Sequence, residues 1–175
     1  MRIQLFFQCL FASLILPSCV AESKLSPESL STDQIDLLEK FSCEQSVRAY
    51  AHSRDQVDWR KNIALFTQDA VMQFGDLKLS GHQEIKKALL DRGPKRFTRH
   101  IITSVNITKT DGGNLEGTSY AVVYGANSNI DGPKPLTANS VDAILTYRDV
   151  FNVRDGHCFI TKRAVTLDMV RTNEE

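Results

Sequence analysis

The sequence predicts an α+β protein in which N-terminal helices pack on a strongly curved antiparallel sheet. Three observations lead to this fold class. Apolar residues recur at helical spacing in the first half of the chain, long alternating segments fill the second half, and turn residues divide those segments. A sheet whose strands follow one another after the helices is typically antiparallel and covered by helices on one face.

The first two helices are expected to meet at an elbow. Helical spacing of apolar residues runs from Asp33 to near Arg54. Asp58 stands directly before Trp59, where its side chain can accept the free amides of a new first turn, so a second helix should begin there. Asp58 is thereby explained, and Asp55 is left in the elbow between the helices.

A hairpin, a third helix and four long strands complete the predicted fold. The hairpin spans residues 70–80 and turns at Gly75-Asp76, and the third helix spans residues 80–93. The long strands are predicted at residues 97–110, 115–125, 139–153 and 157–170. A long curved sheet closed by helices on one side forms a cone, and such a cone normally holds a small apolar molecule.

Alternation divides the residues of these strands between two faces. In the first long strand one face carries Thr98, His100, Ile102, Ser104 and Asn106. The inward face of the third long strand is apolar and is interrupted by Tyr147 and Asp149. A charge on such a face is costly unless it is paired or functional. Two interpretations of Asp149 stay open, a pocket residue or an ion-pair partner of Arg99, Arg148 or Arg163.

The first 21 residues have the layout of an export signal, with an early arginine, an apolar run and then small residues. The run is too short to cross a membrane. Two interpretations of its end stay open. Residues 19–21 fit a small-x-small cleavage site, whereas residues 16–19 fit a lipobox in which Cys19 is lipidated. We expect an exported protein, periplasmic or secreted, whose one route to membrane attachment is a lipid on Cys19.

The rest of the chain divides into a polar tether at residues 22–32, one domain at residues 33–170 and a polar tail at residues 171–175. Lysine plus arginine and aspartate plus glutamate are equal at 21 each, so no net field attracts the protein to nucleic acid. Beyond the predicted signal the cysteines are Cys43 and Cys158. They are either one disulfide of an exported protein or two small buried residues.

Five stretches, in chain order, resemble the SnoaL-like family of the nuclear transport factor 2-like superfamily, whose members have a cone-shaped α+β fold. They are residues 48–74, 80–89, 97–108, 119–125 and 147–168. The resemblance extends from about Asp33 to Met169. It implies the cone fold and, because this fold often dimerises through its sheet, a homodimer. The superfamily includes dehydratases, dehydrohalogenases, isomerases, cyclases and non-catalytic binding domains, so the fold alone does not define an activity.

The resemblance also implies a catalytic pair. Scytalone dehydratase and hexachlorocyclohexane dehydrochlorinase use an aspartate before the second helix and a histidine early in the first long strand, and Asp55 and His100 match these positions. The carboxylate would orient the imidazole, and the free ring nitrogen would take a proton from carbon. The chain departs from the pattern at Arg54, where scytalone dehydratase has a tyrosine, and at Cys158, which replaces a common indole. The alternative is that Asp55 stabilises the elbow and His100 is a buried histidine with a structural role.

Five further residues are candidates for contact with a substrate, and these are Tyr50, Trp59, Ile102, Tyr147 and Asp149. Trp59 has the alternative of a core residue that anchors the second helix. The other histidines, His52, His82 and His157, have no metal-ligand spacing, so no metal is expected. Glycine-rich nucleotide motifs are absent from the sequence, and no cofactor is expected.

Two functions follow as hypotheses. The first is a cofactor-independent lyase or isomerase that binds a small, largely apolar molecule and uses the Asp55–His100 pair to remove a proton. The alternative is a non-catalytic module that binds such a ligand or dimerises.

Overall fold

The helices and strands follow one another in the order predicted from the sequence. A computed structural model describes residues 30–91, 97–126, 132–136 and 141–171, so the predicted export signal, nearly all of the predicted tether and residues 172–175 lie outside the described residues. The elements are α1 Thr32–Asp55, α2 Trp59–Ile63, β1 Phe66–Phe74, β2 Leu77–Ser80, α3 Gly81–Asp91, β3 Phe97–Lys109, β4 Leu115–Ala126, β5 Val141–Arg154 and β6 His157–Val170. None of the described helices is both long enough and apolar enough to span a membrane.

Side-chain caps fix where the first two helices begin. Ser31 caps α1 and forms a capping box with Gln34, in which each side chain bonds the backbone of the other residue. Asp58 caps α2, because its Oδ1 accepts the Lys61 N–H at 3.1 Å. The predicted role of Asp58 is confirmed, and Asp55 is the last residue of α1.

The described strands form one curved sheet in the order β2-β1-β6-β5-β4-β3. Strands β3 to β6 are an antiparallel meander, and β1 pairs with β2 in a hairpin. The sheet is mostly rather than wholly antiparallel, because β1 runs parallel to β6. A parallel pairing requires a long crossover, and here residues 75–156 lie between these two strands.

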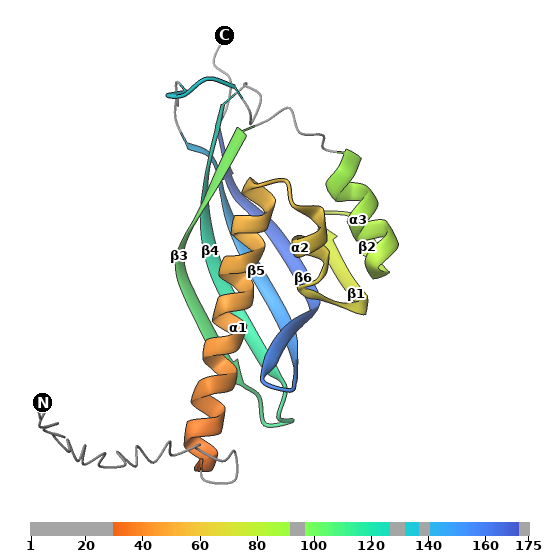
Figure 1. The fold of residues 1–175 in the computed structure, drawn as a ribbon, viewed down its shortest axis with the longest axis vertical. Coiled ribbons are helices and arrows are strands. Elements are labelled where there is room, and N and C mark those ends of the chain that lie inside the picture. Colours follow the sequence, from red (N-terminus) through yellow and green to blue (C-terminus); the bar gives the residue numbers. More distant parts are fainter. Residues whose placement is uncertain (1–29, 92–96, 127–131, 137–140, 172–175) are drawn as a thin grey trace, which may run out of the picture. The chain divides into compact units, whose positions relative to one another are not determined.

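The helices cover one face of this sheet (Figure 1). Helix α1 packs against β3 and β6, and α3 packs against β1. The core between α1 and the sheet includes Val47, Phe66, Phe151 and Ile160. Cys43 of α1 and Cys158 of β6 form a disulfide, so this helix is also bonded covalently to the sheet.

The inward face of β3 changes partway along the strand. Alternation holds to Ile102, but the pairing with β4 shifts between Ile102 and Ser104. Beyond this β-bulge, Val105 packs against the core, whereas Ser104 and Asn106 are exposed. The prediction that Ser104 and Asn106 share a face with His100 is wrong, because the bulge inserts one residue and reverses the alternation.

Candidate functional site

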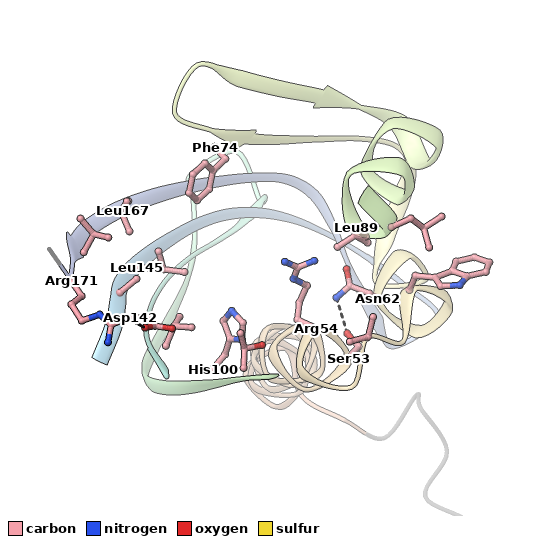
Figure 2. Close-up of a pocket in the computed structure, with 17 residues that line it drawn as sticks. Ser53, Arg54, Asn62, Phe74, Leu89, His100, Asp142, Leu145, Leu167 and Arg171 are labelled. Carbon is pink, nitrogen blue, oxygen red and sulfur yellow. Dashed lines mark hydrogen bonds and ion pairs between the residues drawn. The ribbon is translucent and has the colours of Figure 1, made fainter. Parts of the chain in front are cut away.

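A cavity of about 710 Å³ lies where the C-terminal end of α1 meets the open ends of the sheet strands. Its wall combines apolar side chains from α3 and the sheet with a smaller number of polar groups (Figure 2). The polar groups are Ser53, Arg54, Asn62, Thr98, His100, Asp142 and Arg171. An apolar cavity with a few convergent polar groups is the usual form of a small-molecule site.

Asp55 and His100 form a closely bonded pair at this cavity. The Nδ1 atom of His100 lies 2.6 Å from Oδ1 of Asp55. The backbone N–H of His100 donates to Oδ2 at 2.8 Å, and the Thr98 hydroxyl donates to Oδ1 at 3.0 Å. The side chains are only 8% exposed for Asp55 and 11% for His100. The structure therefore brings together the two residues that the family resemblance paired.

The environment of Asp55 favours its ionised form. Burial by itself raises the pKa of the carboxyl group, but the hydrogen bonds from the ring and backbone of His100, the charge of His100 and the Thr98 hydroxyl outweigh burial and lower the pKa. An ionised carboxylate only accepts hydrogen bonds, so Nδ1 of His100 must donate. The lone pair of neutral His100 is then on Nε2.

The second ring nitrogen of His100 is available to a ligand. His100 lines the cavity, and within the described residues no side chain or backbone group forms a hydrogen bond with Nε2. Figure 2 shows the imidazole projecting from β3 toward the cavity interior. This arrangement supplies a base with one nitrogen fixed by a carboxylate and the other open to a bound molecule.

Arg54 also lines the cavity, at the position where scytalone dehydratase has a tyrosine. Its guanidinium extends from the last turn of α1 into the space beside His100 in Figure 2. Among the described residues, no carboxylate forms an ion pair with it. From the sequence Arg54 was evident only as a departure from the family pattern and not as a cavity residue.

Asn62 and Ser53 form a polar group on the cavity wall that the sequence analysis missed. The Asn62 amide donates to the Tyr50 carbonyl at 3.2 Å and to the Ser53 hydroxyl oxygen at 2.8 Å, while the Ser53 hydroxyl donates to the same carbonyl. A carbonyl only accepts, so these contacts fix which end of the amide is NH₂. The sequence places Asn62 in the short second helix. Its partners on α1, Tyr50 and Ser53, are evident only in the fold.

Of the five predicted substrate-contact residues, the structure places one in the cavity wall. Trp59 lies there, half-buried, with Lys86 Nζ 4.0 Å from its ring centroid. Tyr50, Tyr147 and Asp149 are fully buried and are not among the lining residues. Ile102 is partly buried against the core and does not line the cavity either.

Asp149 is buried and does not line the cavity because the neighbouring strand supplies a counter-charge. Arg163 of β6 lies opposite Asp149 of β5 and forms two hydrogen bonds with its carboxylate, each 2.7 Å long. Tyr50 and Tyr147 stack on this guanidinium, with ring centroids 4.0 and 4.6 Å from it. Of the interpretations that the sequence left open, the structure shows Asp149 as the partner of Arg163, in a buried cluster outside the cavity lining.

A helix-covered, curved and mostly antiparallel sheet with a cavity at its open end defines the cone class of the nuclear transport factor 2-like superfamily. The family model described as "SnoaL-like domain" matches residues 36–164. The chain belongs to the SnoaL-like family. Among proteins of curated function, none matches the sequence.

Solved structures with the same fold have low sequence identity to this chain. ActVI-ORFA from Streptomyces coelicolor is 20% identical with a TM-score of 0.61, over 73% of this chain and 95% of its own. A putative scytalone dehydratase from Novosphingobium aromaticivorans is 18% identical with a TM-score of 0.66, over 83% and 93%. The beta subunit of a putative aromatic-ring-hydroxylating dioxygenase from the same species is 16% identical with a TM-score of 0.63, over 78% and 94%. At this identity the similarity establishes the fold alone.

Proposed function

We propose that the protein is a cofactor-independent lyase or isomerase that binds a small, largely apolar molecule in its cavity and removes a proton from carbon through His100. The observation that carries the proposal is the 2.6 Å contact of His100 Nδ1 with the Asp55 carboxylate, together with an open Nε2 at the cavity. The similarity to a putative scytalone dehydratase supports the same chemistry.

In the proposed reaction, Nε2 accepts a proton from a carbon next to a carbonyl, and the C–H electrons move to the carbonyl oxygen to form an enolate. A lyase then expels a leaving group from the neighbouring carbon as the double bond forms, whereas an isomerase returns the proton to a different carbon. Asp55 stays ionised throughout and stabilises the imidazolium that forms. The apolar wall excludes water from this step.

Deuterium exchange tests the proton-transfer step without knowledge of the natural substrate. The probe is 2-tetralone in D₂O, whose α-hydrogens are followed by proton NMR. We expect the protein to accelerate exchange above the buffer rate and His100→Gln to reduce that acceleration by about 10²-fold or more, because general-base catalysis typically contributes on that order. His52→Gln is the matched control, since His52 is exposed on α1.

Two outcomes would count against this function. Full exchange activity in a folded His100→Gln variant would remove His100 as the base. Binding of 2-tetralone to the wild-type protein without any acceleration would instead support the alternative, a non-catalytic ligand-binding module.

A further inference from the structure

Arg54 is a cation in the cavity wall, and no described carboxylate forms an ion pair with it. Two other arginines are paired away from the cavity lining: Arg48 bonds Glu44 at 2.7 Å on the outer surface of α1, and Arg163 is bonded to Asp149. Arg171, at the cavity rim, lies 3.7 Å from Asp142. Within the part of the chain that the structure describes, Arg54 has no such partner.

The position of Arg54 in α1 does not account for the direction of its side chain. A cation in the last turn of a helix interacts favourably with the helix dipole, and His52 and Arg54 both occupy this turn. His52 is exposed to solvent, however, whereas Arg54 is partly buried in the cavity wall. Partial burial of an unpaired guanidinium carries a desolvation cost that a solvent-facing arginine would avoid.

Most of the other lining side chains are apolar and suit an apolar body. They include Phe74 of β1, Leu89 of α3, Val123 of β4, Leu145 of β5 and Leu167 of β6. Figure 2 shows Leu145 and Leu167 on the opposite side of the cavity from Arg54, with His100 between the two sides. Asp142 and Arg171 lie on the same side as these leucines, where they pair with each other. A molecule with one anionic end and one apolar end would match both parts of this wall.

We propose that the ligand of this cavity is an organic monocarboxylate, whose carboxylate binds Arg54 and whose apolar body lies against Leu145 and Leu167. This inference rests on the cavity being the ligand site of the proposed function, but not on catalysis. A guanidinium presents paired N–H donors that match a carboxylate in a bidentate arrangement. The carboxylate is an anchor separate from the reacting carbon, because hydrogens next to a carboxylate are much less acidic than those next to a ketone.

Binding of two probes with the same apolar body tests the anchor. The probes are cyclohexanecarboxylate and the neutral cyclohexylmethanol, each titrated at low salt and followed by fluorescence of Trp59, the single tryptophan of the chain, which lines the cavity. We expect the wild-type protein to bind the carboxylate at least tenfold more tightly, equivalent to about 1.4 kcal/mol. This preference should decrease as salt rises.

Substitutions of Arg54 test whether this residue causes the preference for the carboxylate probe. Arg54→Gln should abolish it and leave binding of cyclohexylmethanol within about threefold, whereas Arg54→Lys should retain part of it because the charge remains but the planar donor pair is lost. The control is Arg48→Gln, which removes the same charge from the same helix outside the cavity. Its carboxylate preference should equal that of the wild-type protein.

Each contrary outcome has a definite meaning. Equal binding of the two probes, no detectable binding of either, an equal loss for both in Arg54→Gln, or the same loss in Arg48→Gln would each overturn the inference. A wild-type protein that shows the carboxylate preference but exchanges no deuterium into 2-tetralone would fail the proposed catalysis and still support the anion anchor.

Discussion

The cone holds two buried carboxylate pairs, which differ in what they leave free. Asp149 and Arg163 lie outside the cavity lining, in the part of the cone called here the closed end, and Asp55 and His100 lie at the cavity, the open end. At the closed end, Asp149 and Arg163 are 1% and 0% exposed, and both carboxylate oxygens are bonded to the guanidinium. At the open end, Asp55 bonds one ring nitrogen of His100, and the other nitrogen is left facing the cavity. The closed pair is thus suited to holding the fold, whereas the open pair can interact with a ligand.

Electrostatics at the closed end favour fixed ionisation states. Burial alone would lower the pKa of Arg163, but the Asp149 carboxylate outweighs burial and the net pKa is raised, so the guanidinium stays charged. Burial raises the pKa of Tyr147, whose phenol therefore stays neutral. Arg163 and Tyr147 therefore each keep one protonation state near neutral pH. The comparison predicts that substitutions there change stability and that substitutions at the open end change ligand chemistry.

The largest expected effect is at the closed pair. Asp149→Ala leaves the buried charge of Arg163 uncompensated and should lower the free energy of unfolding by about 3–5 kcal/mol, measured by urea denaturation. Lys87→Met, which removes an exposed ion pair with Asp91, should cost less than about 0.5 kcal/mol. Equal effects of the two substitutions would show that the closed pair is no more important than a surface pair.

The second largest effect on stability is expected for the disulfide. It joins Cys43 and Cys158 across a sequence separation of 115 residues, so its removal restores much conformational freedom to the unfolded chain. The double variant Cys43→Ser with Cys158→Ser should lose about 2–5 kcal/mol of stability. The measurement is urea denaturation of the variant and of the wild-type protein with and without reductant. If reductant destabilises the double variant as strongly as the wild-type protein, the loss does not come from this bond.

A smaller effect is expected at Gly117, where side chains of the neighbouring strands approach the backbone closely. A Cβ on Gly117 of β4 would lie 2.7 Å from Ile107 Cδ1 and 2.8 Å from Phe151 Cε2, closer than carbon atoms can approach. Gly117→Ala should cost about 1–3 kcal/mol through overpacking. Gly112→Ala is the matched control, because its nearest neighbour would be 3.9 Å away. A thermal unfolding midpoint that decreases equally in both variants would contradict the packing explanation.

The sequence was sufficient for the fold class and for the Asp55–His100 pair, because ordered motifs and caps are local or family-wide signals. It was not sufficient to select the partner of Asp149. The turn at Asp155-Gly156, with φ of 51° and 74°, would place Asp149 opposite Lys162 in an uninterrupted hairpin. A register shift between Val150 and Phe151 places it opposite Arg163 instead.

Which side chains point into the cavity could not be predicted from the sequence either. Arg54 and Asn62 belong to helices whose facing surfaces depend on how α1 and α2 meet at the elbow. The residues next to them in sequence do not specify the angle between these two helices. The bulge in β3 had a similar effect, since one inserted residue removed Ser104 from the face that carries His100.

The smallest expected effect on stability is at the open pair, and its pH dependence distinguishes it from the closed pair. The pKa of Asp55 is lowered in the folded protein relative to the ordinary carboxyl value of 3.8. The unfolded chain therefore binds more protons in acid, and the contribution of Asp55 is fully present above the ordinary value and is lost as the pH falls through the folded one. Asp55→Asn should cost about 1–2 kcal/mol near neutral pH, since the amide keeps part of the hydrogen bonding.

The difference between the wild-type protein and Asp55→Asn should shrink as the pH falls below 3.8, which urea denaturation at stepped pH would measure. Asp58→Asn is the control three residues further along, where asparagine caps a helix about as well as aspartate. A difference for Asp55→Asn that is constant across this range would mean that ionisation of Asp55 does not stabilise the fold. Asp55 would then support the elbow by shape alone, and the electrostatic basis for pairing it with His100 would be lost.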